Sequence, residues 1–234
     1  MMPFANRRQA GRDLARQLGG YADREDVIVL GLPRGGVPVA AEVAYALRAP
    51  LDVLVVRKLG VPGHEELAMG AVASGGARVL NASIVHDLGV SGDAVERIER
   101  EERAELARRE RLFRGDRPTP ELRGKIVVLV DDGIATGATM RSAVAALGNG
   151  PAARVVVATP VAAPEAVEVL RREADEVVCL GTPHDFVAVG RWYRDFPQTS
   201  DAEVRELLAE AGRAQAERAR EEGEGARHDR EGSS

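Results

Sequence analysis

Short apolar runs alternate along this chain with longer stretches in which apolar residues recur every three or four positions. The short runs are rich in valine, isoleucine and leucine, which is typical of strands buried on both faces of a sheet. They predict strands at residues 27–30, 51–56, 126–130, 154–159 and 176–180. The longer stretches predict helices at residues 7–18, 37–47, 93–112, 140–147 and 164–174. Strands that alternate with helices predict an α/β fold, with a doubly wound, mainly parallel sheet and helices on both faces.

The remaining segments predict connections and a tail. Pro62 and Gly63 interrupt any hydrophobic period, so residues 60–69 are expected to form a loop. Short β segments are predicted around a Gly-Gly turn, at residues 70–73, 78–80 and 84–86. Residues 212–234 are almost entirely charged or small, which predicts a fraying helix end followed by a disordered tail. One domain is therefore expected over residues 1–211, with a charged tail after it.

Composition narrows the classes of function. A hydrophobic content of 44% in 234 residues supports a substantial core, and the single cysteine, Cys179, is expected to be a buried thiol. The net charge of -5 argues against a nucleic-acid-binding surface, and glutamates interleave with arginines in the charged helix at 93–112. No apolar stretch approaches the roughly 20 residues of a membrane span, and the first residues lack the apolar centre of a signal peptide. We therefore expect a cytoplasmic protein that binds neither nucleic acid nor membrane.

The most distinctive chemistry follows the predicted strand at 126–130, where two aspartates, Asp131 and Asp132, stand side by side. Small and hydroxyl-bearing residues come next, namely Gly133, Thr136, Gly137 and Thr139. Loop N–H groups and the N-terminus of the following helix can bind an anion, and the threonine hydroxyls add donors. Paired carboxylates repel a phosphate but accept hydrogen bonds from vicinal hydroxyls such as those of ribose. The segment therefore predicts a site for a sugar phosphate.

This segment resembles the phosphoribosyl-pyrophosphate signature of type I phosphoribosyltransferases, in which an apolar strand, two acidic residues and a T-G-x-T loop follow one another. The resemblance implies that Asp131 and Asp132 bind the ribose 2′- and 3′-hydroxyls, and Mg²⁺ either directly or through water. It also implies a loop around the 5′-phosphate, formed by Ala135, Thr136, Gly137, Ala138 and Thr139. The alternative is an ordinary strand-to-helix turn, which requires neither the acidic pair nor two glycines.

Two other predicted loops carry cations at strand ends, where ligands gather in open parallel sheets. Arg34, followed by Gly35 and Gly36, resembles the pyrophosphate loop of the family, because an arginine fork grips phosphate oxygens. Arg57 and Lys58 end the predicted second strand, and either one suits the charge that builds on a pyrophosphate leaving group. The alternative for both loops is a plain turn whose cations reach solvent.

The segment after Lys58 resembles the family's mobile loop, and Glu65 or Glu66 in it are candidates for a general acid or base. A solvated polar loop is the alternative. Residues 182–204, with the N-terminal segment, are expected to form a hood over the base. The aromatic side chains there that could stack on a base are Phe186, Trp192 and Tyr193, with packing onto the core as the alternative.

The resemblance implies a Mg²⁺-dependent enzyme that transfers ribose 5-phosphate from phosphoribosyl pyrophosphate to a nitrogenous base, and it implies a homodimer. Ala135 and Ala138 replace an aspartate and a lysine of the 6-oxopurine enzymes, which argues against a hypoxanthine/guanine subtype. The acceptor base is not indicated. Two alternatives use the same site: a non-catalytic sensor of a nucleotide or phosphoribosyl pyrophosphate, and a hydrolase of such compounds.

Overall fold

Five parallel strands form the central sheet of the computed structural model, which describes residues 2–150 and 152–231. Within those ranges the side chains of residues 65, 66 and 221–231 are not described. The strand order is β2 (Leu51–Val53), β1 (Val27–Gly31), β6 (Ile126–Val130), β7 (Arg154–Val161) and β8 (Glu176–Gly181). The chain proceeds outward from β1 in one direction and from β6 in the other. The neighbouring strands β1 and β6 therefore flank a topological switch point, where ligands bind in folds of this class.

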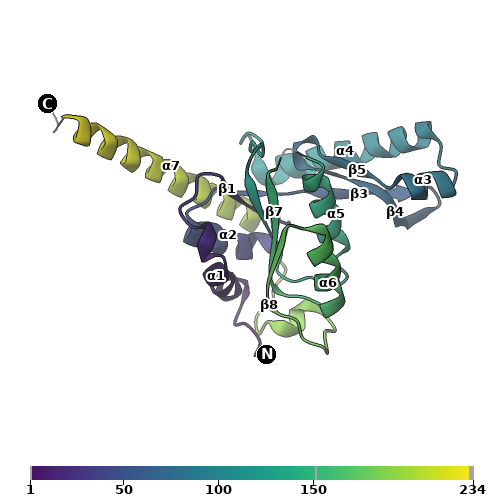
Figure 1. The fold of residues 1–234 in the computed structure, drawn as a ribbon, viewed down its shortest axis with the longest axis horizontal. Helices are drawn as coiled ribbons and strands as arrows, with labels where there is room; N and C mark the ends of the chain where they lie inside the picture. Colours follow the sequence, from purple (N-terminus) through teal and green to yellow (C-terminus); the bar gives the residue numbers. More distant parts are fainter. Residues whose placement is uncertain (1, 151, 232–234) are drawn as a thin grey trace.

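Helices cover both faces of this sheet (Figure 1). Alternate residues of a strand point to opposite faces, and in β1 the side chains of Val27 and Val29 join a different core cluster from those of Ile28 and Leu30. The first cluster includes residues of α1 (Arg7–Gln17), α2 (Gly36–Leu47) and the start of α7 (Asp201–Glu231). The second includes residues of α5 (Ala138–Gly148) and α6 (Pro164–Glu173). The predicted doubly wound α/β fold is confirmed.

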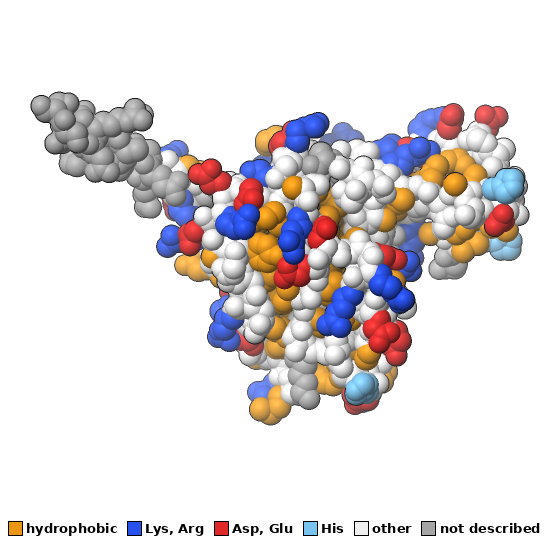
Figure 2. Space-filling model, in the orientation of Figure 1, with side chains coloured by type: hydrophobic (Ala, Val, Ile, Leu, Met, Phe, Trp, Pro, Cys, Tyr) orange, Lys and Arg blue, Asp and Glu red, His pale blue; other side chains and the backbone are white. Residues whose placement is uncertain are grey.

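A second, antiparallel sheet extends from the side of the main one (Figure 1). It contains β3 (Val56–Val61), β4 (His64–Ala73) and β5 (Arg78–Leu80), in that order. Two helices accompany it, α3 (Ala82–Asp87) and the long charged α4 (Gly92–Arg114). Three short 3₁₀ segments complete the fold, at Gly19–Tyr21, Ser74–Gly76 and Val189–Trp192. On the face shown in Figure 2, basic and acidic side chains are interspersed.

Three expectations for this second sheet were wrong. The segment 60–69 is not a loop but part of the β3–β4 hairpin, because Pro62 and Gly63 (φ 76°) form its tight turn between the paired Val61 and His64. The predicted strand 51–56 is divided, since β2 ends at Val53 and Val56 begins β3 in the other sheet. Residues 84–86 are helical rather than extended. Asn81 caps this helix by accepting a hydrogen bond from the N–H of Ile84 at 3.3 Å.

The segment that precedes α1 meets the segment that follows β8 beside the main sheet. Phe4 pairs with Tyr193, and the N–H of Phe4 donates to the carbonyl of Trp192 at 2.8 Å. After Phe196 the chain enters α7, which remains helical through the segment 212–231 that the sequence predicted as a fraying end and tail. Residues 232–234 lie outside the described part. No helix in the described ranges is long and apolar enough to cross a bilayer.

Candidate functional site

The loop after β1 and the end of β6 touch each other at the switch point. Gly36 lies so close to β6 that a Cβ atom there would be 2.7 Å from the carbonyl oxygen of Val130. A Cβ at Gly35 would collide with the carboxylate of Asp132. Leu32 reinforces the contact, because its N–H donates to Val130 at 2.9 Å. Only glycine lets the two backbones approach in this way, so the predicted pyrophosphate loop and the predicted ribose-binding pair form one wall.

Asp131 and Asp132 form a partly buried acidic pair at the end of β6. The N–H of Asp132 donates to Oδ1 of Asp131 at 2.9 Å. Burial raises the pKa of Asp131 well above its ordinary value, and the neighbouring Asp132 charge adds to this rise. Burial also raises the pKa of Asp132, although its hydrogen bond from Arg7 opposes the rise. The pair is thus poised to accept hydrogen bonds or to share a cation.

Arg7, at the start of α1, makes an ion pair with Asp132. Its Nε donates to Oδ2 of Asp132 at 2.7 Å, and both side chains are nearly buried, with exposed fractions of 10% and 14%. Its Nη1 donates to the carbonyl oxygen of Pro197 at 2.6 Å, and its guanidinium carbon lies 3.7 Å from the centroid of the Phe196 ring. A cation over an aromatic face is attracted to it. Arg7 therefore joins the acidic pair to the hood.

The two segments expected to form the hood, the N-terminal segment and residues 182–204, pair with each other, and their aromatic residues make other contacts than predicted. Tyr193 is buried between Phe4 and Phe196, with ring centroids 5.6 and 4.8 Å away. Its hydroxyl donates to the main-chain carbonyl of Asp132 at 2.5 Å. Tyr193 thus supports the signature loop and offers no ring face to a ligand. Trp192 and Phe186 are partly buried and do not line the cavity beside Asp132.

The loop predicted to hold the 5′-phosphate leads into α5. Gly137 has φ 76° and precedes the first helical residue, Ala138. The first part of the loop is bonded to β7, because the N–H of Ile134 donates to the carbonyl oxygen of Val161 at 2.9 Å. Residues Ala135, Thr136 and Thr139 are exposed, while Gly137 is buried. Unpaired N–H groups of a helix N-terminus attract anions, so this loop remains a suitable phosphate site.

Two cavities border the signature, one at Asp132 and one at Thr139. One, of about 390 Å³, lies beside the acidic pair and is lined by Arg7, Arg34, Gly35, Asp132, Phe196, Pro197, Gln198 and Thr199. In it Arg34 is partly exposed, and its guanidinium lies 3.5 Å from the carboxylate of Asp201. The other, of about 600 Å³, lies between the β3–β4 hairpin, α4 and the first turns of α5. A ligand at the signature would have open space toward both the hood and the hairpin.

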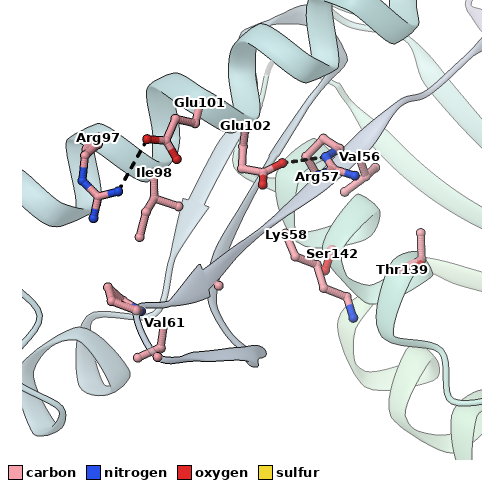
Figure 3. A pocket seen from close by; sticks show the side chains of 13 residues that line it. Val56, Arg57, Lys58, Val61, Arg97, Ile98, Glu101, Glu102, Thr139 and Ser142 are labelled. Atoms are coloured by element: carbon pink, nitrogen blue, oxygen red, sulfur yellow. Dashed lines mark hydrogen bonds and ion pairs between the residues drawn. The ribbon is translucent and has the colours of Figure 1, made fainter.

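The second cavity contains the predicted leaving-group cations (Figure 3). Contrary to expectation, Arg57 and Lys58 lie within β3 rather than at the end of a strand of the main sheet. Arg57 donates through Nε to Glu102 of α4 at 2.6 Å, whereas Lys58 is exposed and extends toward the start of α5, where Thr139 and Ser142 lie. Glu65 and Glu66 lie on β4, and their side chains are outside the described part of the chain.

The described residues contain no group of three or more histidine, cysteine or acidic side chains that could cage a metal. At the signature, the donors that the described chain offers are the carboxylates of Asp131 and Asp132. Mg²⁺ commonly keeps its waters and binds through one or two carboxylates plus substrate phosphates. The donor set therefore fits a Mg²⁺ ion that arrives with a pyrophosphate group, and it does not fit a metal held by the protein alone.

The switch-point loops and the acidic pair define a type I phosphoribosyltransferase fold. A family model described as the phosphoribosyl transferase domain matches residues 5–193, and the chain belongs to this family.

Two curated Mycobacterium tuberculosis proteins, MT0597 of strain CDC 1551 and Rv0571c of strain H37Rv, are each 50% identical over 213 residues and carry provisional names as phosphoribosyl transferases. These matches cover 91% of this chain and 48% of each relative, so the chain spans about half their length. The crystal structure of TT1426 from Thermus thermophilus is similar with 46% identity and a TM-score of 0.81, over 89% of this chain and 99% of that one.

Arg7 and Phe196 are the site residues that the sequence reasoning missed. A signal for Arg7 was present, because positions 7, 10, 11 and 14 lie on the buried face of α1 and Arg7 is the one charged residue among them. A charge on an apolar face requires a partner. Phe196 gave no comparable signal, since only the folded chain brings its ring under Arg7.

Proposed function

We propose that the protein transfers ribose 5-phosphate from phosphoribosyl pyrophosphate to a nitrogenous base. In this reaction a base nitrogen attacks C1 of the ribose, and the C1–O bond breaks with its electron pair going to pyrophosphate. The attacking nitrogen then loses its proton to a general base or to water. The observation that carries the proposal is the contact of Gly35 and Gly36 with Asp132 and Val130. This contact brings the predicted pyrophosphate loop against the predicted ribose-binding carboxylate.

Each part of the site has a task in this reaction. Asp131 and Asp132 accept hydrogen bonds from the ribose hydroxyls, while the 135–139 loop and the N-terminus of α5 bind the 5′-phosphate. Arg34 and Lys58 neutralise charge that develops on the leaving pyrophosphate. Bound Mg²⁺ would neutralise further charge on the pyrophosphate oxygens. The hood and the hairpin limit access of water to the reacting carbon.

The proposal is tested by binding and turnover in the full chain. Calorimetry with phosphoribosyl pyrophosphate and Mg²⁺ should show binding to the wild type, and Asp132→Asn should abolish it because a carboxylate acceptor is lost. Asp87→Asn, an exposed change at the end of α3, is the matched control and should bind normally. A panel of nucleobases should then reveal pyrophosphate release. Wild-type protein that binds no phosphoribosyl pyrophosphate would refute the proposal.

One observation favours a second function, a non-catalytic sensor of the same ligand. Arg57, one of the two predicted leaving-group cations, is held by Glu102 at 2.6 Å rather than free in the cavity. A sensor needs to bind phosphoribosyl pyrophosphate but not to stabilise its departing group. Tight binding with no pyrophosphate release across the panel would favour the sensor over the transferase.

A further inference from the structure

Arg7 is the only basic side chain on the buried face of α1, and its contacts converge on the predicted ribose site. One of its nitrogens bonds Asp132, another bonds the carbonyl of Pro197, and its planar group lies over Phe196. Each contact restricts the guanidinium in a different direction. A guanidinium restricted in this way can in turn fix the orientation of a group that it contacts. Here that group is the carboxylate of Asp132 in the signature.

The two carboxylate oxygens of Asp132 are in different environments. Oδ2 accepts the hydrogen bond from Arg7 and faces Gly35, where even one added carbon would collide with it. No side chain among the described residues donates a hydrogen bond to Oδ1, since the one from Arg7 goes to Oδ2. The main-chain carbonyl of the same residue is held by the hydroxyl of Tyr193. Arg7 and Tyr193 thus fix the orientation of Asp132 from two sides and leave Oδ1 as the acceptor for a ligand hydroxyl.

The charge of Arg7 also matters for the pair as a whole. Asp131 and Asp132 are adjacent, and like charges at this separation repel each other strongly when partly buried. Arg7 is the one cation that makes an ion pair with either carboxylate among the described residues. Because Arg7 is also bound to Pro197 and Phe196, its position depends on the hood being closed against α1.

We propose that Arg7 is a positioning residue for the ribose site. It holds Asp132 so that Oδ1 faces the sugar hydroxyls, and it makes sugar binding depend on a formed hood. This inference rests on the proposed binding of phosphoribosyl pyrophosphate. It assigns Arg7 no contact with the reacting atoms.

The test separates recognition of the sugar from recognition of the phosphates. Binding of phosphoribosyl pyrophosphate and of pyrophosphate alone, each with Mg²⁺, is measured for wild type, Arg7→Gln and Arg7→Lys. We expect Arg7→Gln to weaken binding of phosphoribosyl pyrophosphate by about tenfold to a hundredfold, the effect of losing a charge-assisted hydrogen bond. Binding of pyrophosphate should change by less than about twofold, within the scatter of surface substitutions. Arg7→Lys keeps the charge without the planar fork and should fall between wild type and Arg7→Gln.

Arg8→Gln is the matched control, because Arg8 is the next residue of α1 and its side chain is half exposed beside Glu42. It should bind both ligands as the wild type does. Phe196→Leu provides an independent route if Arg7→Gln does not fold. It removes the ring beneath the guanidinium, keeps the charge, and should weaken binding of phosphoribosyl pyrophosphate while leaving pyrophosphate binding unchanged.

The possible results are distinct. Equal losses for the two ligands would mean that Arg7 supports the fold generally, and the inference would be overturned. Unchanged or tighter binding of phosphoribosyl pyrophosphate to Arg7→Gln would overturn it as well, since tighter binding would mean that Arg7 masks Asp132. Failure of the wild type to bind phosphoribosyl pyrophosphate would instead refute the proposed function.

Discussion

The hydroxyl of Tyr193 donates a hydrogen bond to the main-chain carbonyl of Asp132, so a side chain of the hood supports the backbone of the signature loop directly. Burial raises the pKa of this phenol, and the Asp132 charge raises it further, so the hydroxyl keeps its proton at physiological pH. The donor is therefore present whenever the protein is folded under ordinary conditions.

Replacing Tyr193 with phenylalanine should lower the free energy of unfolding by about 1 to 2 kcal/mol, because a partly buried carbonyl loses its partner. Urea denaturation followed by circular dichroism measures the change. Tyr45→Phe is the control, since Tyr45 is 76% exposed and should give the wild-type midpoint. Equal midpoints for Tyr193→Phe and wild type would show that water replaces the lost donor.

Gly35→Ala should impair the site itself, because the new methyl group collides with the carboxylate of Asp132. We expect binding of phosphoribosyl pyrophosphate to weaken by about tenfold or more, the factor that corresponds to about 1.4 kcal/mol. Isothermal titration calorimetry measures this. Gly148→Ala, at the open end of α5 with no atom near the added carbon, should bind normally. Normal binding of phosphoribosyl pyrophosphate to Gly35→Ala would mean that the loop shifts to accommodate the methyl group without moving Asp132.

A buried ion pair joins helix α4 to the main sheet. Nε of Arg114 in α4 lies 3.1 Å from both carboxylate oxygens of Asp52 in β2, and each side chain is only 4% exposed. Asp52→Ala should therefore destabilise the fold by about 1.5 to 3 kcal/mol, because the buried cation loses a charged hydrogen-bond partner and keeps only the carboxylate of Glu110, 3.2 Å away. Arg97→Ala breaks an exposed pair with Glu101 and should cost less than about 1 kcal/mol. Chemical denaturation of both variants would show the contrast, and similar losses would contradict it.

The single cysteine allows a test of pH dependence. Burial raises the pKa of the Cys179 thiol, whose Sγ donates to the carbonyl of Gly181 at 3.2 Å. The unfolded thiol ionises near pH 8.5, so the stability that the protonated thiol provides is present below about pH 8.5 and is lost as pH rises through the folded pKa. Wild type should lose stability relative to Cys179→Ala as pH rises above about 8.5. Parallel pH curves for the two proteins would exclude this contribution.

Patterns of hydrophobicity and residue spacing predicted those elements whose structure depends mainly on residues close in sequence. The strand Ile126–Val130, the acidic pair and the helix after Gly137 follow one another in sequence, so hydrophobicity and spacing were enough. The hairpin was not predicted because Pro62 and Gly63 interrupt the hydrophobic period, whereas their geometry suits a tight turn between two strands.

Such patterns do not predict contacts between residues that are far apart in the sequence. Arg7 and Asp132 are 125 positions apart, and nothing near either one indicates the other. Arg57 was expected at the end of a strand, but β2 stops at Val53 and Val56 begins β3 in the other sheet. Between them, the N–H of Val55 donates to the hydroxyl of Ser74, 19 positions away, at 2.9 Å. The wall of the candidate site was predictable from local patterns, whereas the partners that Arg7 finds in Asp132, Pro197 and Phe196 were not.

The pairing of Phe4 with Tyr193 has a consequence for how the molecule assembles. A contact between such distant positions closes a long loop, which is slow and entropically costly. On a ribosome, α1 is made before the strands of the main sheet, yet Arg7 lacks the contacts described above until Asp132, Pro197 and Phe196 have been synthesised. The proposed sugar-binding half of the site is therefore completed only after Phe196, so a nascent chain that already contains the whole signature still lacks the residues that contact Asp132.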